Sequence, residues 1–221
     1  MEKVKDLLNP INDNLKVRQR KDAVGSTYVD DITEAEVFTE DDVYDVIEKG
    51  GAARAIAKTD MNAHSSRSHS CFMLTVVQYN ELEQSKVTGT LYLVDLAGSE
   101  SVKKTGATGS TLEQAKSINQ SLSTLRGVID ALNVKQNKPK SKIVVPYRES
   151  KLTYILKNSL GGNSKTCMIV ACSPHPYNEV ETLSTLNFAL AVRSIKQKAE
   201  VNVEYTVPQL LKKLEEAEGE I

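Results

Sequence analysis

Apolar and polar residues follow two different periods along this chain. Between Thr111 and Leu132 apolar residues recur every three or four positions, which predicts an amphipathic helix with one buried face. Residues 70–79 and 87–94 are rich in Val, Leu, Phe, Met and Tyr, and the polar stretch between them predicts a long hairpin. The chain therefore combines helix and strand periods.

Shorter elements complete this pattern. Thr39 followed by Asp42 predicts a capping box that opens a helix over 40–49, and Gly50-Gly51 predicts its end. The apolar run 166–172 predicts a buried strand. The other predicted elements are a hairpin of 15–20 and 27–29 around Gly25, a polar loop at 133–142, a helix from a Ser150 cap through Leu160 closed by Gly161-Gly162, a helix over 182–195 and a last helix opened by Pro208. Together they predict an α/β sandwich with helices on both faces of a sheet.

Composition narrows the functional classes. With 221 residues, of which 40% are hydrophobic, the chain has enough apolar material for one globular domain. Its 28 basic and 29 acidic residues nearly cancel, so charged partners must be sought in local clusters such as the lysines of 135–142. No apolar run reaches the roughly 20 residues of a membrane-spanning helix. We expect a cytoplasmic protein that neither enters a membrane nor binds nucleic acid.

The cysteines and histidines predict no zinc site. Cys167 and Cys172 are separated by an odd number of positions along one predicted strand, so their side chains would face opposite ways. We expect the three cysteines to be core thiols in a reducing compartment, with His69 and His175 unrelated to them.

A first polar segment, residues 62–69 (NAHSSRSH), lies between the apolar residues Met61 and Cys71. Consecutive hydroxyl groups are suitable ligands for metal ions and phosphate oxygens, and an adjacent Arg can pair with a phosphate or a carboxylate. Taken alone, the segment is better explained as an ordinary serine-rich loop.

A second segment, residues 91–100 (LYLVDLAGSE), is a hydrophobic strand that ends in Asp95 and is followed by Gly98. A carboxylate at a strand end can hold Mg²⁺ through water, and a glycine amide can approach a terminal phosphate closely because it has no Cβ. Taken alone, a strand followed by DxxG is also compatible with a buried strand and a turn.

Five motifs in order make the pattern specific: NAHSSRSH, DLAGSE, SINQSL, VPYRESKLT and TLSTLNFA. In this order the chain resembles the kinesin motor family, and in particular the conventional transport kinesins, from its first residues to about Val207. The resemblance implies an α/β fold that is part of the kinesin P-loop hydrolase sandwich, a central and mostly β sheet flanked by helices. It implies ATP and Mg²⁺ as cofactors and microtubules as the partner.

The resemblance assigns domains and roles. Residues 1–193 would be a partial motor domain with switch I at 62–69, switch II at 95–100, a relay helix at 111–132 and a microtubule-binding loop and helix at 133–160. Residues 194–207 would be the neck linker, and 208–221 would begin a neck helix able to form a coiled-coil homodimer. The residues that the resemblance assigns to nucleotide binding and hydrolysis are Asn62, Ser65, Ser66, Arg67, Asp95, Gly98, Glu100 and Asn119.

In these roles Ser65 would meet Mg²⁺, and Asp95 would belong to its water shell. Ser66 and Asn62 would lie near the γ-phosphate and the attacking water, and the Gly98 amide would donate to that phosphate. Arg67 and Glu100 would form a salt bridge that closes the two switches around ATP, and Asn119 would support the water relay. A buried ion pair whose geometry depends on a phosphate is a bistable latch.

Contacts to the acidic tubulin surface are implied for Lys104, Arg148 and Lys151. The lysines of 135–142 either join them or form a solvated face. The sequence departs from the family pattern at Arg126, where a small residue is usual, at Tyr154, where an Arg is common, and at Val144, where an aromatic residue or His is usual.

The phosphate-binding pattern GxxxxGK[ST] is absent from these 221 residues. Because that loop supplies most of the phosphate affinity, we expect no ATP hydrolysis by this chain alone. We also expect an incomplete sheet with unpaired strand edges, as in a fragment of a longer motor. Two alternatives stay open: a microtubule-binding module without catalysis, and a nucleotide hydrolase unrelated to microtubules.

Overall fold

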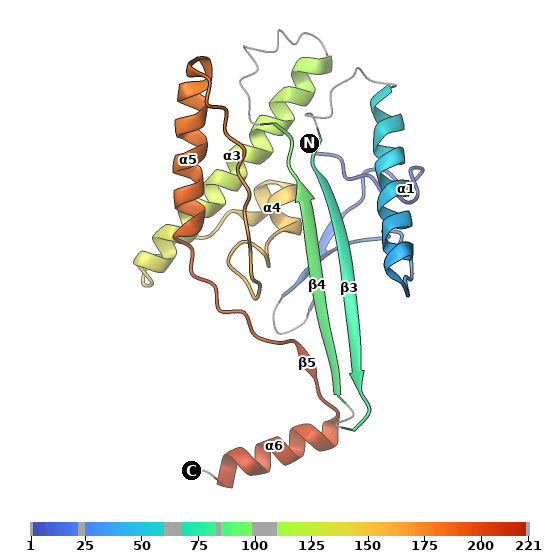
Figure 1. Cartoon of the computed structure of the whole chain (residues 1–221). Coiled ribbons are helices and arrows are strands. Elements are labelled where there is room, and N and C mark those ends of the chain that lie inside the picture. The colour runs from blue at the N-terminus through green and yellow to red at the C-terminus, as the bar shows by residue number, and fades with distance from the viewer. Residues whose placement is uncertain (1, 22–24, 60–67, 83–84, 99–109, 220–221) are drawn as a thin grey trace. The chain divides into compact units, whose positions relative to one another are not determined.

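The computed structural model describes residues 2–21, 25–59, 68–82, 85–98 and 110–219. The chain divides into two compact units, Met1–Ser68 with Leu96–Ala199 and His69–Asp95 with Glu200–Ile221. Figure 1 shows the elements of both units in the colours of the sequence.

Helices and one short hairpin form the first unit. Leu125, Val128 and Ile129 of the long helix α3 are buried, as is Leu152 of α4, and the two helices are in contact. The central part of the predicted apolar stripe is therefore confirmed. The elements are β1 (Val17–Gln19), β2 (Thr27–Val29), α1 (Glu40–Thr59), α3 (Ser110–Asn137), η2 (Tyr147–Glu149), α4 (Lys151–Ile155), η3 (Pro176–Asn178) and α5 (Glu179–Arg193).

The helix α1 continues beyond its predicted end. Its capping box is confirmed, because the Asp42 amide donates to Thr39 Oγ1 at 3.2 Å and the Thr39 amide donates to Asp42 Oδ2 at 2.8 Å. The predicted stop at Gly50-Gly51 is wrong, because the helix runs to Thr59. The alanine-rich sequence after the glycines, AARAIA, favours helix strongly enough to offset their cost of about 1 kcal/mol each.

The helix α3 extends beyond the predicted end at Leu132, because residues 133–137 are helical and not part of the predicted loop. Polar side chains of this last turn bond to the end of α5. Asn133 Nδ2 donates to the Ala191 carbonyl at 2.8 Å, and Gln136 Nε2 donates to the Ser194 carbonyl at 3.0 Å. These tertiary bonds are invisible to a search for apolar periodicity.

The apolar run 166–172 is not a strand, and this prediction is wrong. Ile169 is 92% exposed, and both Cys167 and Cys172 are exposed, so they are not core thiols. In the described part of the chain no strand is paired with this run, and a strand without a partner leaves its backbone groups unsatisfied. Cys71, in contrast, is half-buried, and burial raises the pKa of its thiol to about 11.

The helix predicted from Ser150 to Leu160 is shorter than expected. Regular α-helix ends at Ile155, and turns continue to Gly161, whose φ of +104° is in the left-handed region. A Cβ there would lie 2.8 Å from Leu132 Cδ2, so glycine is required at this turn.

Strands dominate the second unit. β3 (Ser70–Asn80) and β4 (Ser85–Asp95) form the predicted long hairpin, and β5 (Val203–Glu204) pairs antiparallel with β4. α6 (Val207–Gly219) follows, with Pro208 in its first turn as predicted.

A side-chain bond extends the pairing of β5. The Thr88 amide donates to the Asn202 carbonyl at 3.1 Å, and Asn202 Nδ2 donates to the Thr88 carbonyl at 3.3 Å. Asn202 therefore bonds to both the backbone amide and the backbone carbonyl of Thr88.

A buried carboxylate organises the N-terminal segment. The Asp6 side chain is nearly inaccessible, and its oxygens accept from the amides of Leu8 at 2.9 Å, Asn9 at 3.1 Å and Thr33 at 2.7 Å. Burial by itself would raise the pKa of Asp6, but the hydrogen bonds from Thr33, Leu8 and Asn9 outweigh it and lower the pKa below the ordinary 3.8.

We expect Asp6→Ala to lower the free energy of unfolding by about 3 kcal/mol, because three amides lose a charged acceptor. Asp6→Asn keeps one acceptor oxygen and should cost roughly half as much. Because the folded pKa lies below the unfolded one, the stabilisation is complete above about pH 4 and is lost as the pH falls through the folded pKa. Denaturant melts at pH 7 and pH 3 measure this. Exposed Asp13→Ala is the control, and an equal loss there would contradict the assignment.

We expect Asn202→Ala to speed hydrogen exchange at the Thr88 amide about three- to tenfold, because one bond that holds residues 200–206 on β4 is lost. The matched control is Glu204→Gln, which removes an ion pair between Lys86 and Glu204 whose side chains are 35% and 67% exposed. Such an exposed pair contributes little. Equal acceleration in both variants would show that Asn202 has no special part in the pairing.

Candidate functional site

The register of the β3–β4 hairpin determines where the two polar segments meet. Ser70 pairs with Asp95 at one end, and Asn80 pairs with Ser85 at the turn. The first polar segment ends at His69, directly before β3, and the second segment leaves β4 at Asp95, the last residue of that strand. The two segments therefore leave the hairpin at the same end, although more than twenty residues of chain separate them.

The structure describes only part of the predicted nucleotide set. Asp95 is exposed at the end of β4, Gly98 lies three residues further on, and Asn119 is half-buried on α3. The remaining predicted residues lie outside the described part of the chain: Asn62, Ser65, Ser66, Arg67, Glu100 and Lys104.

The donor chemistry fits a magnesium nucleotide. The Asp95 carboxylate and the hydroxyl groups of Ser65 and Ser66 are hard oxygen ligands of the kind that Mg²⁺ prefers. Among the described residues, no group of three or more His, Cys, Asp or Glu could hold a metal ion by itself.

Of the predicted microtubule contacts, Arg148 and Lys151 lie in the described part of the chain. A cavity of about 440 Å³ lies between the β1 strand and α4, and four of its lining residues are basic. Lys151 Nζ donates to the Leu15 carbonyl at 3.0 Å and to Asn14 Oδ1 at 3.3 Å. The lining residues, which we call the basic groove, are Lys16, Val17, Arg18, Arg148, Ser150, Lys151 and Tyr154.

Charges in the basic groove are only partly compensated. Arg18 forms an ion pair with Asp30, the residue that follows β2. No ion pair is recorded for Lys16, Arg148 or Lys151 within the described ranges, and the recorded side-chain acceptors of Arg148 and Lys151 are neutral oxygens. The groove therefore presents net positive charge to an acidic partner.

Sequence reasoning missed Glu2, which fixes the start of α4. Ser150 occupies the N-cap position, but its side chain makes no capping bond. Its hydroxyl donates instead to Glu2 Oε1 at 2.6 Å, and the other Glu2 oxygen accepts from the Lys151 amide. Nothing local could have revealed this, because 148 residues separate the partners.

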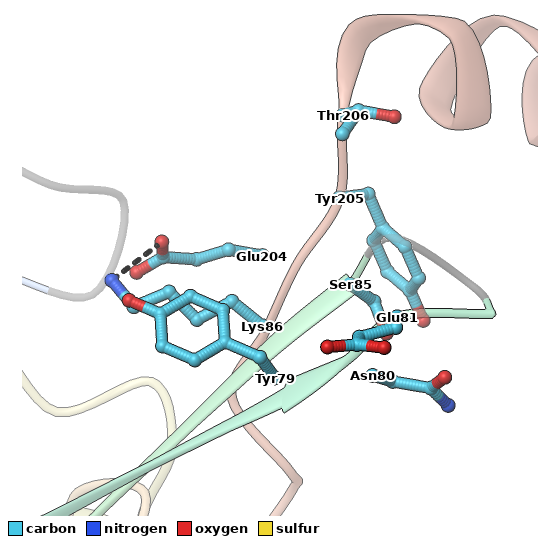
Figure 2. Close-up of a pocket in the computed structure, with 8 residues that line it drawn as sticks. All are labelled: Tyr79, Asn80, Glu81, Ser85, Lys86, Glu204, Tyr205 and Thr206. Carbon is cyan, nitrogen blue, oxygen red and sulfur yellow. Dashed lines mark hydrogen bonds and ion pairs between the residues drawn. The ribbon is translucent and has the colours of Figure 1, made fainter.

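A second cavity, of about 380 Å³, lies where β5 joins the turn end of the hairpin (Figure 2). The rings of Tyr79 and Tyr205 lie on its wall, and Lys86 Nζ reaches Glu204 Oε2 at 3.2 Å. Its walls expose mainly carbon, and it contains none of the predicted nucleotide residues. We assign it no ligand.

None of the described helices is both long and apolar enough to cross a bilayer.

The α6 helix exposes the side chains of Leu210, Leu211 and Leu214, which are not covered by other residues of the described unit.

The curated proteins most similar to this chain include several kinesin heavy chains. This chain is 50% identical over its whole length to the kinesin heavy chain of Gibberella moniliformis, of which it covers 23%. It is 48% identical over 97% of its length to the human kinesin-1 heavy chain, of which it covers 22%. The chain thus spans about a quarter of these curated relatives.

Solved structures of kinesins are also similar to this chain. The structure of a fast kinesin superposes on 92% of this chain with a TM-score of 0.79 and 53% sequence identity, and the superposition covers 55% of the fast kinesin chain. A KIF14 dimer, solved with AMP-PNP in complex with a microtubule, superposes on 90% with a TM-score of 0.78 and 41% identity, and 57% of that chain is covered. These neighbours confirm the predicted α/β class.

The family comparison covers most of the chain. The kinesin motor domain family matches residues 1–195, which include both polar segments, the hairpin that joins them and the basic groove. This chain belongs to the kinesin motor domain family.

Proposed function

We propose that this chain forms the switch-bearing and microtubule-facing part of a motor that hydrolyses ATP to move along microtubules. Its similarity to kinesin heavy chains and to a solved kinesin bound to AMP-PNP and a microtubule supports this. The observation that carries the proposal is the pairing of Ser70 with Asp95, which brings both polar segments to one end of a hairpin.

The short distances along the chain from the hairpin end support the proposal that both polar segments reach one phosphate. Arg67 is three residues before Ser70 and Glu100 is five after Asp95, so their backbones reach at most about 10 Å and 17 Å from the hairpin end. Neighbouring strands are about 5 Å apart, so chain length permits the two residues to meet. In this proposal a pairing of Arg67 with Glu100 would latch the two segments when a phosphate holds them in place.

In this proposal each segment has a distinct task. Ser65 and Asp95 would hold Mg²⁺, the latter through water, and the bound metal would neutralise charge on the phosphates. Ser66 and Asn62 would orient the attacking water, and the Gly98 amide would donate to the terminal phosphate. Asn119, half-buried on α3, would support the water relay and connect the site to that helix.

The mechanical output would pass through α3 and through the C-terminal segment. Residues 194–207 would act as the neck linker, and the pairing of β5 with β4 would be its docked form. The exposed leucines of α6 would form the start of a dimeric neck. The protein would act on microtubules in the cytoplasm.

A second candidate is a microtubule-binding module without catalysis. The observation that favours it is that none of the 221 residues form a GxxxxGK[ST] motif. Both candidates share the basic groove, so binding to microtubules tests both, and ATP hydrolysis separates them.

We expect this chain to cosediment with microtubules at low salt and progressively less as salt rises, because exposed charge attraction is screened. Arg148→Gln and Lys151→Gln should each weaken the affinity about three- to tenfold through the lost attraction to acidic tubulin. Lys49→Gln, an equal charge loss on exposed α1, should change it less than about twofold. Salt-independent pelleting, or equal effects of all three, would contradict the proposed surface.

We expect no ATP hydrolysis by this chain alone, and microtubule-stimulated hydrolysis by a chimera that adds the GxxxxGKT-bearing part of a kinesin heavy chain. In the chimera, Gly98→Ala should lower kcat about 100-fold, because a Cβ hinders the amide from reaching the phosphate. The control is Gly89→Ala, where an added Cβ meets nothing within 4 Å. A chimera unaffected by Gly98→Ala would refute the role of that amide.

A further inference from the structure

Arg148 is held in place by two side chains that no motif singles out for this task. Its Nη2 donates to Gln19 Oε1 at 3.3 Å, and its guanidinium lies 5.5 Å from the centre of the Tyr154 ring. The Tyr154 hydroxyl donates to the same Gln19 oxygen at 3.5 Å. One amide oxygen on β1 thus joins a basic side chain of η2 to an aromatic side chain of α4.

The amide of Gln19 is itself oriented by the short hairpin. Gly25 has a φ of +63°, and a Cβ on it would lie 2.3 Å from Gln19 Nε2. Glycine favours this left-handed backbone and leaves the space in which the Gln19 amide nitrogen lies, while the Gln19 oxygen accepts from Arg148 and Tyr154. Lys157 fastens the same turn, because its Nζ donates to the Gly25 carbonyl at 3.0 Å.

This arrangement orders Arg148 without neutralising it. A glutamine oxygen and a tyrosine ring are uncharged, so they restrict the guanidinium but leave its positive charge available. Arg18 shows the contrast, because its ion pair with Asp30 removes much of its attraction for an outside anion. Since ordering a long side chain in advance lowers the entropic cost of binding, such a residue binds more tightly than a free one.

We propose that Gln19 and Tyr154 are positioning residues that preorder Arg148 for an acidic surface of the microtubule. The inference rests on the proposed function, because it assumes that the basic groove is the face that meets tubulin. Gly25 belongs to the same device, since it makes the space in which the Gln19 amide lies.

A double-mutant cycle on microtubule affinity tests the proposal. In the otherwise unaltered chain, Gln19→Leu and Tyr154→Leu should each weaken cosedimentation about two- to tenfold, because Arg148 then loses its preordering. In an Arg148→Ala background the same substitutions should have almost no effect. Tyr154→Phe, which keeps the ring, should lose less than Tyr154→Leu. A merely structural role would instead weaken binding equally in both backgrounds.

A matched control is Tyr28→Leu, which removes the ring that lies 5.1 Å from Arg20 on the same hairpin. Its effect should be the same with and without Arg148→Ala. A second readout needs no microtubules: ¹⁵N relaxation of the Arg148 side chain should show an ordered guanidinium in the unaltered chain and a freely moving one in Gln19→Leu.

The outcomes separate the two proposals. If the unaltered chain does not pellet with microtubules, the proposed function is overturned and with it the task given to these residues. If it pellets but Gln19→Leu and Tyr154→Leu bind as tightly as before, or if Arg148 moves freely in the unaltered chain, only the positioning role is overturned.

Discussion

Antiparallel pairing of β3 with β4 is the constraint on which the rest of this structure depends. Each strand contributes eleven residues, so the hairpin is about 35 Å long at 3.3 Å per residue. A slip of one residue would turn every side chain of the slipped strand to the other face. The two polar segments adjoin the hairpin at its open end, where Ser70 pairs with Asp95. Near the turn end, Lys86 and Val87 pair with β5. One rigid element thus connects the segments assigned to the nucleotide with the segment assigned to the neck linker.

The basic groove depends on a different kind of interaction, in which polar side chains fasten distant segments to a five-residue helix. Glu2 fixes the first turn of α4, Lys151 holds the backbone at Leu15, and the Thr27 hydroxyl donates to the Ile155 carbonyl at 3.2 Å. A helix this short is unstable alone. Lys151 serves two purposes, since its side chain brings positive charge to the groove and also joins α4 to the segment that precedes β1.

Local patterns in the sequence were sufficient for the elements that depend on local chemistry. The Thr39–Asp42 cap, the long hairpin and the buried centre of α3 followed from capping, β propensity and periodicity. Errors arose where distant contacts decide the outcome. The last turn of α3 bonds to α5, and the run 166–172 has no partner strand among the described residues. Of the candidate site, the motifs identified the residues, but neither Glu2 nor Gln19 carries a local signal, because each acts on a segment more than 120 residues away.

The pairing of Ser70 with Asp95 makes both polar segments leave the β3–β4 hairpin at the same end. Nuclear Overhauser contacts between backbone protons of β3 and β4 in the isotope-labelled chain measure this directly. The account predicts contacts of Ser70 with Asp95 and its immediate neighbours, and of Asn80 with Ser85. A register in which Ser70 instead faces Leu91, or two strands without mutual contacts, would contradict it.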